Sequence, residues 1–454
     1  MKPQLKQRFV AGWKRFLYTG PAPDETRRNL RRVWESMILH IHPTRVPAKA
    51  LTFTYTWGLG GISTLLCLTL AVTGILLMFR YDSDVERAYL SIQALETEVL
   101  FGSLIRALHH WSANLLAITA FLHMLRVFFT GGFKAGRKLN WVIGVVLFVL
   151  VLAFNFTGYL LPWDQVAYWA ITITTTVIQH IPAIGREISN AVLAGSEVGQ
   201  GALRNFYALH VAVLPATVII LLGYHFWRVR KDGGISQPLP RDGEEIEKLT
   251  TVPHLVRRET AVAAAVITLL ILFSMLVPAP LGGVADPLRS PNPAKAAWYL
   301  GGFQELLLHM ETEAAMVFMA LVFAGVIAVP ILDRQDDNIG LACRSRTGVY
   351  AALLGLALAI NLVPALIVAD EYYINWVAWF PNWPSLLANG FLPMVGLLVL
   401  LGLVYGIARR LLKANRSEGL VALFSFLMTS FVVLTIVCAF FRGANMDLVL
   451  PGGL

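Results

Sequence analysis

The sequence predicts an all-α, polytopic membrane protein with about nine transmembrane helices. Of its 454 residues, 56% are hydrophobic and only 14% are charged, and the mean hydropathy is +0.63. A helix needs about 20 mainly apolar residues to cross a bilayer. This composition excludes a soluble enzyme. The net charge is +9, but nucleic-acid binding is a poor explanation for it in so apolar a chain. The expected spans are 53–79, 110–130, 140–161, 207–229, 260–278, 313–332, 348–369, 390–412 and 418–441.

Basic residues place the N-terminus in the cytoplasm. Residues 1–50 contain 11 Lys and Arg against three Asp and Glu, and cytoplasmic segments of membrane proteins are enriched in Lys and Arg. The loops after the second, fourth, sixth and eighth spans are also basic, and all four fall on that side. No cleavable signal peptide is expected, because the first long apolar run begins near Leu51. We therefore expect a multi-pass protein of the cell inner (plasma) membrane.

Four histidines lie inside these apolar segments in two pairs. His109 and His123 are 14 residues apart, and His210 and His225 are 15 apart. On a helix, 14 residues rise about 21 Å and return to nearly the same face. Two such helices side by side would present an outer pair, His109 with His210, and an inner pair, His123 with His225. Two imidazoles can ligate haem iron axially, so the pattern predicts a four-helix dihaem bundle. The alternative is that these histidines hydrogen-bond across the bundle.

Glycines repeat with the same spacing in the first and third spans. Gly60 and Gly74 are 14 residues apart, as are Gly144 and Gly158. A missing side chain at each haem level would let a ring approach the backbone. The alternative is ordinary packing of small residues between membrane helices.

Two arginines flank the first histidine pair. Arg106 precedes His109 by three residues, and Arg126 follows His123 by three. A guanidinium at each position is expected to pair with a haem propionate. The alternative for Arg126 is a cytoplasmic anchor.

Two long segments are expected on the outer side. Residues 158–185 predict two short amphipathic helices on the outer surface, and the proline-rich segment 279–312 forms the other outer loop. Together they are expected to cover an apolar pocket beside the outer haem.

With these motifs in place, the chain resembles the cytochrome b subunit of quinol–cytochrome c and quinol–plastocyanin oxidoreductases. The resemblance is dense over residues 35–240 and looser over 280–370. The spacing of 15 residues, with the following Arg230, is similar to the photosynthetic plastoquinol branch. In that branch the first four helices and the next three are separate polypeptides, whereas here they are fused. The motifs are the two histidine pairs, the glycine pairs, Gly131-Gly-Phe-Lys134, Pro162-Trp163-Asp164-Gln165, Ile181-Pro-Ala-Ile-Gly185 and Val198-Gly-Gln200.

The resemblance implies a function and its partners. Membrane quinol would be oxidised at the outer face, with one electron passing to a Rieske iron–sulfur protein and on to a c-type cytochrome or other outer acceptor. The other electron would cross between two b haems to an inner quinone site, near which Arg230 would stabilise reduced quinone; its alternative is a cytoplasmic anchor. A homodimer within a multisubunit complex is implied as well. The outer quinol-site candidates are Trp298, Tyr299, Asp164 and Glu305.

Two departures from the family pattern bear on this function. The family's Pro-Glu-Trp-Tyr is Ala296-Ala297-Trp298-Tyr299 here, so the glutamate thought to carry a quinol proton is absent. Glu305, or else Glu311 or Glu313, is expected to take its place; the alternative is that each of the three is only a loop or capping acid. The photosynthetic branch also tethers an extra haem through a cysteine, where this chain has Gly58, so no covalent third haem is expected. His110 replaces a family arginine, without an evident physical reason.

The expected organisation follows from these assignments. Two alternatives stay open: a dihaem electron conduit in another respiratory complex without bifurcated quinol oxidation, and a haem-free transporter or structural membrane subunit. The expected segments are a cytoplasmic N-terminal segment (1–50), the dihaem domain (51–235), a cytoplasmic linker (236–259), a three-helix quinol-site domain (260–370) and two additional helices (371–454). Within the first segment, Met1–Leu39 is expected to form an interfacial helix; the alternative is a disordered basic tail.

Overall fold

A computed structural model describes residues 42–238, 245–335 and 340–449. The interfacial helix expected over Met1–Leu39 lies outside these residues. Within them, nine helices are long and apolar enough to cross a membrane, which confirms the predicted all-α integral membrane architecture. They are α4 (Leu59–Met78), α6 (Gly102–Phe129), α7 (Lys138–Leu160), α10 with α11 (Gln200–Lys231), α12 with the preceding turn (Thr251–Leu276), α14 (Thr312–Leu332), α15 (Arg346–Tyr372), α17 with the preceding turn (Leu386–Leu411) and α18 (Arg416–Phe440).

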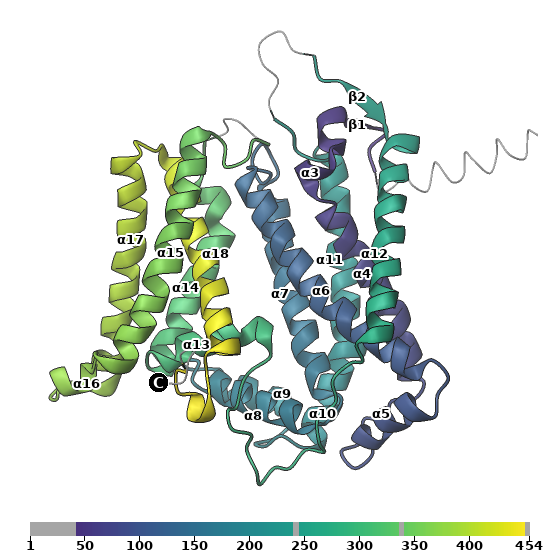
Figure 1. Cartoon of the computed structure of the whole chain (residues 1–454), viewed down its shortest axis with the longest axis vertical. Helices are drawn as coiled ribbons and strands as arrows, with labels where there is room; N and C mark the ends of the chain where they lie inside the picture. The colour runs from purple at the N-terminus through teal and green to yellow at the C-terminus, as the bar shows by residue number, and fades with distance from the viewer. Residues whose placement is uncertain (1–41, 239–244, 336–339, 450–454) are drawn as a thin grey trace, which may run out of the picture.

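The spanning helices form two groups (Figure 1). In the first group α4 packs on α6, α6 on α7, α7 on α11, and α12 on both α6 and α4. In the second group α15, α17 and α13 (Gly301–Leu308) all pack on α18. The last two spans were expected as an addition to the three-helix domain, but α18 lies at the centre of its group. Gly355 permits this, because a Cβ there would lie 2.2 Å from the carbonyl oxygen of Ala422.

Different elements lie at the two ends of the bundle, a short β-sheet at the inner end and short helices at the outer end. At the inner end β1 (Arg45–Pro47) pairs antiparallel with β2 (Lys248–Thr250). At the outer end, α8 (Gln165–Gln179) and α9 (Gly185–Leu193) lie across the helix ends (Figure 1). Two outer helices were predicted within residues 158–185, but only α8 lies in that segment, and α9 begins where it ends. The short helices α5 (Ala88–Thr97), α13 and α16 (Trp376–Trp379) were not predicted.

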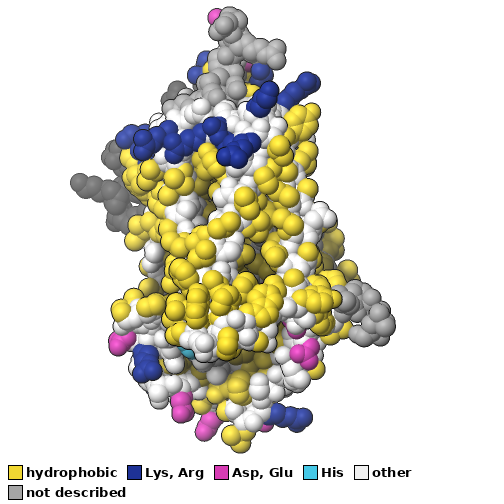
Figure 2. All heavy atoms as spheres, turned by 90° about the vertical axis from the view of Figure 1, so that its left-hand side faces the viewer, with side chains coloured by type: hydrophobic (Ala, Val, Ile, Leu, Met, Phe, Trp, Pro, Cys, Tyr) yellow, Lys and Arg dark blue, Asp and Glu magenta, His cyan; other side chains and the backbone are white. Residues whose placement is uncertain are grey.

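The surface reflects a membrane environment. Figure 2 shows a broad apolar band, with Lys and Arg gathered above it and acidic side chains mostly below it. The basic end is the end that carries β1 and β2. The end that carries β1 and β2 is called the inner end here, and the opposite end, at the bottom of Figure 1, the outer end.

A buried ionic cluster joins the two groups of helices at the inner end. Lys134, from the loop after α6, lies 3.1 Å from Asp333, which directly follows α14. Arg344 pairs with the same carboxylate, and the Ser417 hydroxyl donates to it over 3.0 Å. Lys134, Asp333 and Arg344 are each at most 3% exposed. A carboxylate shared by two buried cations holds the α6–α7 loop against the second group.

We expect Asp333→Ala to destabilise the protein by about 3–5 kcal/mol, because it removes a carboxylate that two buried cations contact. Thermal unfolding in detergent micelles measures the loss as a lowered midpoint. Arg334→Ala is the matched control, since Arg334 is exposed and its side chain donates only to the Ile331 carbonyl among the described residues. Equal midpoints for the two variants would contradict a stabilising role for the cluster.

Candidate functional site

The structure brings the four sequence-predicted histidines together on two neighbouring helices. His109 and His123 lie on α6, and His225 lies on α11 (Leu214–Lys231). His210 lies in a π-helical turn, Leu209–Val213, that joins α10 (Gln200–Ala208) to α11. A π-helical turn takes up one more residue than an α-helical turn. The turn therefore explains why this pair is spaced by 15 residues while the pair on α6 is spaced by 14.

The outer pair has the separation that a shared metal requires. The ring centres of His109 and His210 lie 6.2 Å apart, with the ring planes at 65°. Two imidazole–metal bonds of about 2 Å each, as found at zinc, place the two ring centres about 6 Å apart. His225 lies close enough to His123 for the inner two rings to interact electrostatically.

Glycines of α4 make room for the two histidines of α6. A Cβ on Gly60 would lie 3.2 Å from Cε1 of His123, and a Cβ on Gly74 would lie 3.2 Å from Cε1 of His109. Both distances are shorter than an ordinary van der Waals contact between carbons. The sequence predicted these glycines at the haem levels, and in the structure the ring that meets each backbone is an imidazole.

Two glycines of α7 face the other two histidines, His210 and His225. A Cβ on Gly158 would lie 2.7 Å from Cε1 of His210, which the ring could not accept without moving. A Cβ on Gly144 would lie 3.6 Å from Cε1 of His225, an ordinary contact. Each of the four glycines thus faces one of the four histidines.

Two threonines orient the outer imidazoles. Nδ1 of His109 lies 2.9 Å from Oγ1 of Thr73, and Nδ1 of His210 lies 3.1 Å from Oγ1 of Thr157. Each hydroxyl donates to a carbonyl of its own helix, Thr73 to Thr69 over 2.7 Å and Thr157 to Ala153 over 2.9 Å. Each hydroxyl therefore accepts from Nδ1–H, which leaves Nε2 as the unprotonated, ligating nitrogen.

Sequence reasoning missed these threonines, although a signal was present. Each one directly precedes the glycine that faces the same histidine, in Thr73-Gly74 and Thr157-Gly158.

The inner histidines have no such neighbour, and Nδ1 of His225 has no hydrogen-bond partner among the described residues. A buried polar atom without a partner is costly, so the inner pair is open to a further ligand. Two neutral imidazoles per level, each with a glycine against its ring, fit a bis-histidine haem.

The arginines near the histidines have different surroundings. Arg106 is buried, pairs with Glu96, and donates to the carbonyls of Ala279 over 3.0 Å and Pro280 over 2.6 Å. It thereby holds the outer loop to α6, and its pairing with a propionate stays a prediction. Arg126 donates to the Tyr55 carbonyl, and its Nη2 is buried without a partner among the described residues.

The outer-loop candidates take different roles in the structure. Asp164 caps α8 by accepting from the Ala167 amide over 2.9 Å, and its other oxygen accepts from the Gly282 amide over 2.8 Å. These bonds fix the outer loop in place. Trp298 donates to Oδ1 of Asn114 over 2.6 Å.

A large apolar cavity lies between the two groups of helices. Its volume is about 1310 Å³, and it is lined from α6 and α7 on one side and from α14, α15, α17 and α18 on the other. Trp298 and Tyr299 line it, and the buried Tyr299 hydroxyl has no partner among the described residues. An apolar cavity with a few polar groups is the usual form of a small-molecule site.

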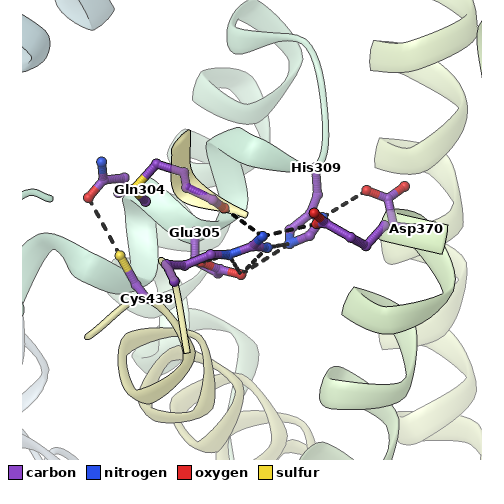
Figure 3. A network of polar contacts seen from close by, with 8 residues as sticks. Gln304, Glu305, His309, Asp370 and Cys438 are labelled. Atoms are coloured by element: carbon purple, nitrogen blue, oxygen red, sulfur yellow. Dashed lines mark hydrogen bonds and ion pairs between the residues drawn. The ribbon is translucent and has the colours of Figure 1, made fainter. Parts of the chain in front are cut away.

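Glu305 does not line this cavity, although the sequence made it a quinol-site candidate. Its side chain is fully buried and pairs with Arg442 over 2.7 Å. His309, one helical turn later, reaches the cavity wall instead, and its Nδ1 lies 2.7 Å from Oδ2 of Asp370 (Figure 3). Sequence reasoning missed His309, Asp370 and Arg442, because they come from three separate segments.

We expect Gly60→Leu to remove the inner haem, because the new side chain would occupy the space of the His123 ring. The haem content of the purified chain, measured from a reduced-minus-oxidised spectrum, should fall by about half. Gly61→Leu is the matched control on the same helix, because a Cβ at Gly61 meets nothing within 4 Å. Equal haem content in the two variants would show that the Gly60 contact does not matter.

Comparisons with known proteins agree with this geometry. The family model described as "Cytochrome b/b6/petB" matches residues 46–233. Cytochrome b6 of Heliomicrobium gestii is 44% identical over 198 residues, which are 44% of this chain and 91% of that protein. Cytochrome b6 of Acaryochloris marina (strain MBIC 11017) is 46% identical over 182 residues, which are 40% of this chain and 84% of that protein.

The C-terminal half is matched by structure. The solved structure titled "Hyperthermophilic respiratory Complex III" aligns with a TM-score of 0.66 over 91% of this chain and 98% of that chain, at 19% identity. At this identity the match shows a shared fold, and it extends over both groups of helices. On the sequence match to the cytochrome b6 proteins, the chain belongs to the cytochrome b/b6 family.

Proposed function

We propose that this chain is the dihaem electron-transfer subunit of a quinol-oxidising, Rieske-containing membrane complex. Its family implies b-type haem. The observation that carries the assignment of two haems is the repeated pairing of one glycine with one histidine at four positions. His109 and His210 would hold the outer haem iron, and His123 and His225 the inner one.

When bound, the two haems supply one-electron redox chemistry. The chain's contribution is to fix their positions on two rigid helices. The 14 residues between His109 and His123 correspond to about 21 Å along α6, so the two sites lie in different halves of the membrane. Thr73 and Thr157 set the orientation of the outer ligands. Nη2 of Arg126 has no hydrogen-bond partner in the described ranges, so Arg126 is suited to pair with an inner haem propionate.

The outer part of the cavity is the proposed site of quinol oxidation. Its apolar walls exclude water and suit a lipid-soluble quinol. The buried Tyr299 hydroxyl has no hydrogen-bond partner within the described part of the chain, so it is suited to hydrogen-bond a quinol oxygen, and Trp298 lines the same cavity. One electron would pass to a Rieske iron–sulfur protein and then to a c-type cytochrome or other outer acceptor. The other would pass through both haems to an inner quinone.

The inner quinone site would lie near the cytoplasmic end of α11. Arg230 is in the last turn of that helix, where a cation is suited to a reduced, negatively charged quinone. We further propose a cell inner (plasma) membrane location, a cytoplasmic N-terminus, and a homodimer within a multisubunit complex.

One observation favours a second candidate, a dihaem conduit that does not bifurcate electrons. Ala297 stands where the family has a glutamate, and it is nearly buried just before Trp298. Alanine cannot take a proton. Bifurcated oxidation at this site therefore requires another proton acceptor in the cavity.

His123→Ala tests the haem assignment. We expect a reduced-minus-oxidised spectrum of the purified wild-type chain to show two b haems, and the variant to lose the inner one, because a metal site loses an axial ligand. His180→Ala is the control, since His180 is exposed and bonds only the Thr176 carbonyl among the described residues. A folded wild-type chain without haem would rule out the proposed function and favour a transporter or structural subunit.

A further inference from the structure

The cavity between the two groups of helices has one place where protons can be exchanged. Among the described residues that line it, only His309 and Asp370 carry imidazole or carboxyl side chains. The Tyr299 phenol also lines the cavity, but burial raises its pKa far above its usual range. The other lining residues are apolar, apart from a few hydroxyl and indole groups. Trp298 and Tyr299 lie just before α13, His309 directly follows it, and Asp370 is in the last turn of α15, so all four come from the outer ends of their elements.

The two side chains are in direct contact, and one oxygen is left open. Nδ1 of His309 lies 2.7 Å from Oδ2 of Asp370. Oδ1 of Asp370 has no hydrogen-bond partner in the part of the chain that the structure describes. The side chain of Asp370 is 26% exposed, whereas that of His309 is 12% exposed. Asp370 therefore offers the more accessible acceptor atom.

The surroundings of His309 favour its charged form. Burial lowers the pKa of His309, but hydrogen bonds and charges from Asp370 and Glu305 outweigh it and raise the pKa to about 9. A carboxyl group in an apolar cavity tends to be neutral and then cannot accept a proton, whereas a cation in contact favours its charged form. His309 supplies that cation to Asp370.

Nε2 of His309 has a partner in either protonation state. It lies 3.3 Å from Oε1 of Glu305, which accepts when the nitrogen carries a proton, and 3.3 Å from Nη2 of Arg442, which donates when it does not. Arg442 itself is held by Glu305 and, over 3.0 Å, by Glu371 (Figure 3 shows the centre of this network). A histidine that is satisfied in both states can change its charge without leaving a buried polar atom unpaired.

We propose that Asp370 accepts the proton of the quinol hydroxyl at the outer end of the cavity, while His309 holds its carboxylate in position and favours its charged form. The inference rests on the proposed function. In this step the quinol O–H bond breaks and a new O–H bond forms at Oδ1 of Asp370. No electron moves in the step; the electrons leave to the haem and the iron–sulfur partner of the proposed function. The pair thus takes the place of the proton acceptor that Ala297 cannot provide.

The other outer carboxylates are less suited to this role. Both oxygens of Glu305 accept from Arg442, and its side chain is fully buried away from the cavity. Glu311 accepts from Ser385, and neither Glu311 nor Glu313 lines the cavity. The charged groups around the pair are therefore Glu305 from α13, Glu371 from α15 and Arg442 after α18; α14 and α17 bring no charged side chain to the described cavity.

Asp370→Asn in the intact complex tests the proposal. The electron donors are a decyl-substituted benzoquinol and 2,3-dimethyl-1,4-naphthoquinol, and stopped-flow absorbance follows b-haem reduction. With whichever of the two quinols reduces the wild-type complex, we expect the rate of b-haem reduction to be at least tenfold lower in Asp370→Asn. Dithionite should still reduce the full amount of haem in the variant. Glu187→Gln, a carboxylate change on the exposed face of α9 at the same outer end that does not line the cavity, should stay within twofold of wild type.

A pH profile separates proton acceptance from a structural role. In the wild type the rate should fall at low pH as the acceptor becomes protonated, and Asp370→Asn should lack this acid limb. Asp370→Glu, which retains the carboxylate, should recover most of the rate and its acid limb, and it serves as the test if the asparagine variant fails to assemble.

The outcomes distinguish this inference from the proposed function. An active wild type with an equally active Asp370→Asn, or an Asp370→Glu variant that assembles with full haem content and yet has no acid limb, would overturn the inference alone. A wild-type complex whose haems neither quinol reduces would overturn the proposed function, and this inference with it.

Discussion

The close contact between glycine backbone and imidazole ring is the constraint on which the first group of helices depends. Each of α4 and α7 contributes two glycines, and each glycine faces one histidine of α6 or of the α10–α11 segment. At Gly60, Gly74 and Gly158 any side chain would push the helices apart or displace the rings. The spacing of the ligands is thus coupled to the spacing of the glycines on the neighbouring helix. The π-helical turn at Leu209–Val213 lets a pair spaced by 15 residues meet the same requirement.

The second group of helices closes the other side of an apolar cavity. Its connection to the first group is made at both ends by polar contacts. At the inner end Lys134 and Arg344 share the carboxylate of Asp333. At the outer end Trp298, which precedes α13, donates a hydrogen bond to Asn114 of α6. A buried apolar cluster from α6, α7, α14 and α18 also joins the two groups, and the cavity beside it leaves room for a lipid-soluble ligand.

Much of the fold and part of the site could be predicted from the sequence. Hydropathy located all nine spans because the bilayer imposes a minimum apolar length on each helix. The histidine and glycine spacings were visible because they repeat along single helices. The network of Glu305, His309, Asp370 and Arg442 was not predictable in this way. Its members come from α13, α15 and the segment after α18, and only tertiary packing brings them together.

Sequence also could not show which way a side chain would face. Glu305 was the expected proton acceptor, but it points away from the cavity and pairs with Arg442, whereas His309 reaches the wall from the same segment.

The central claim is that two bis-histidine haem sites are built into the first group of helices. Electron paramagnetic resonance of the oxidised, purified chain tests it most directly. The account predicts signals from two distinct low-spin ferric haems, and a high-spin signal or the absence of haem from a folded chain would contradict it.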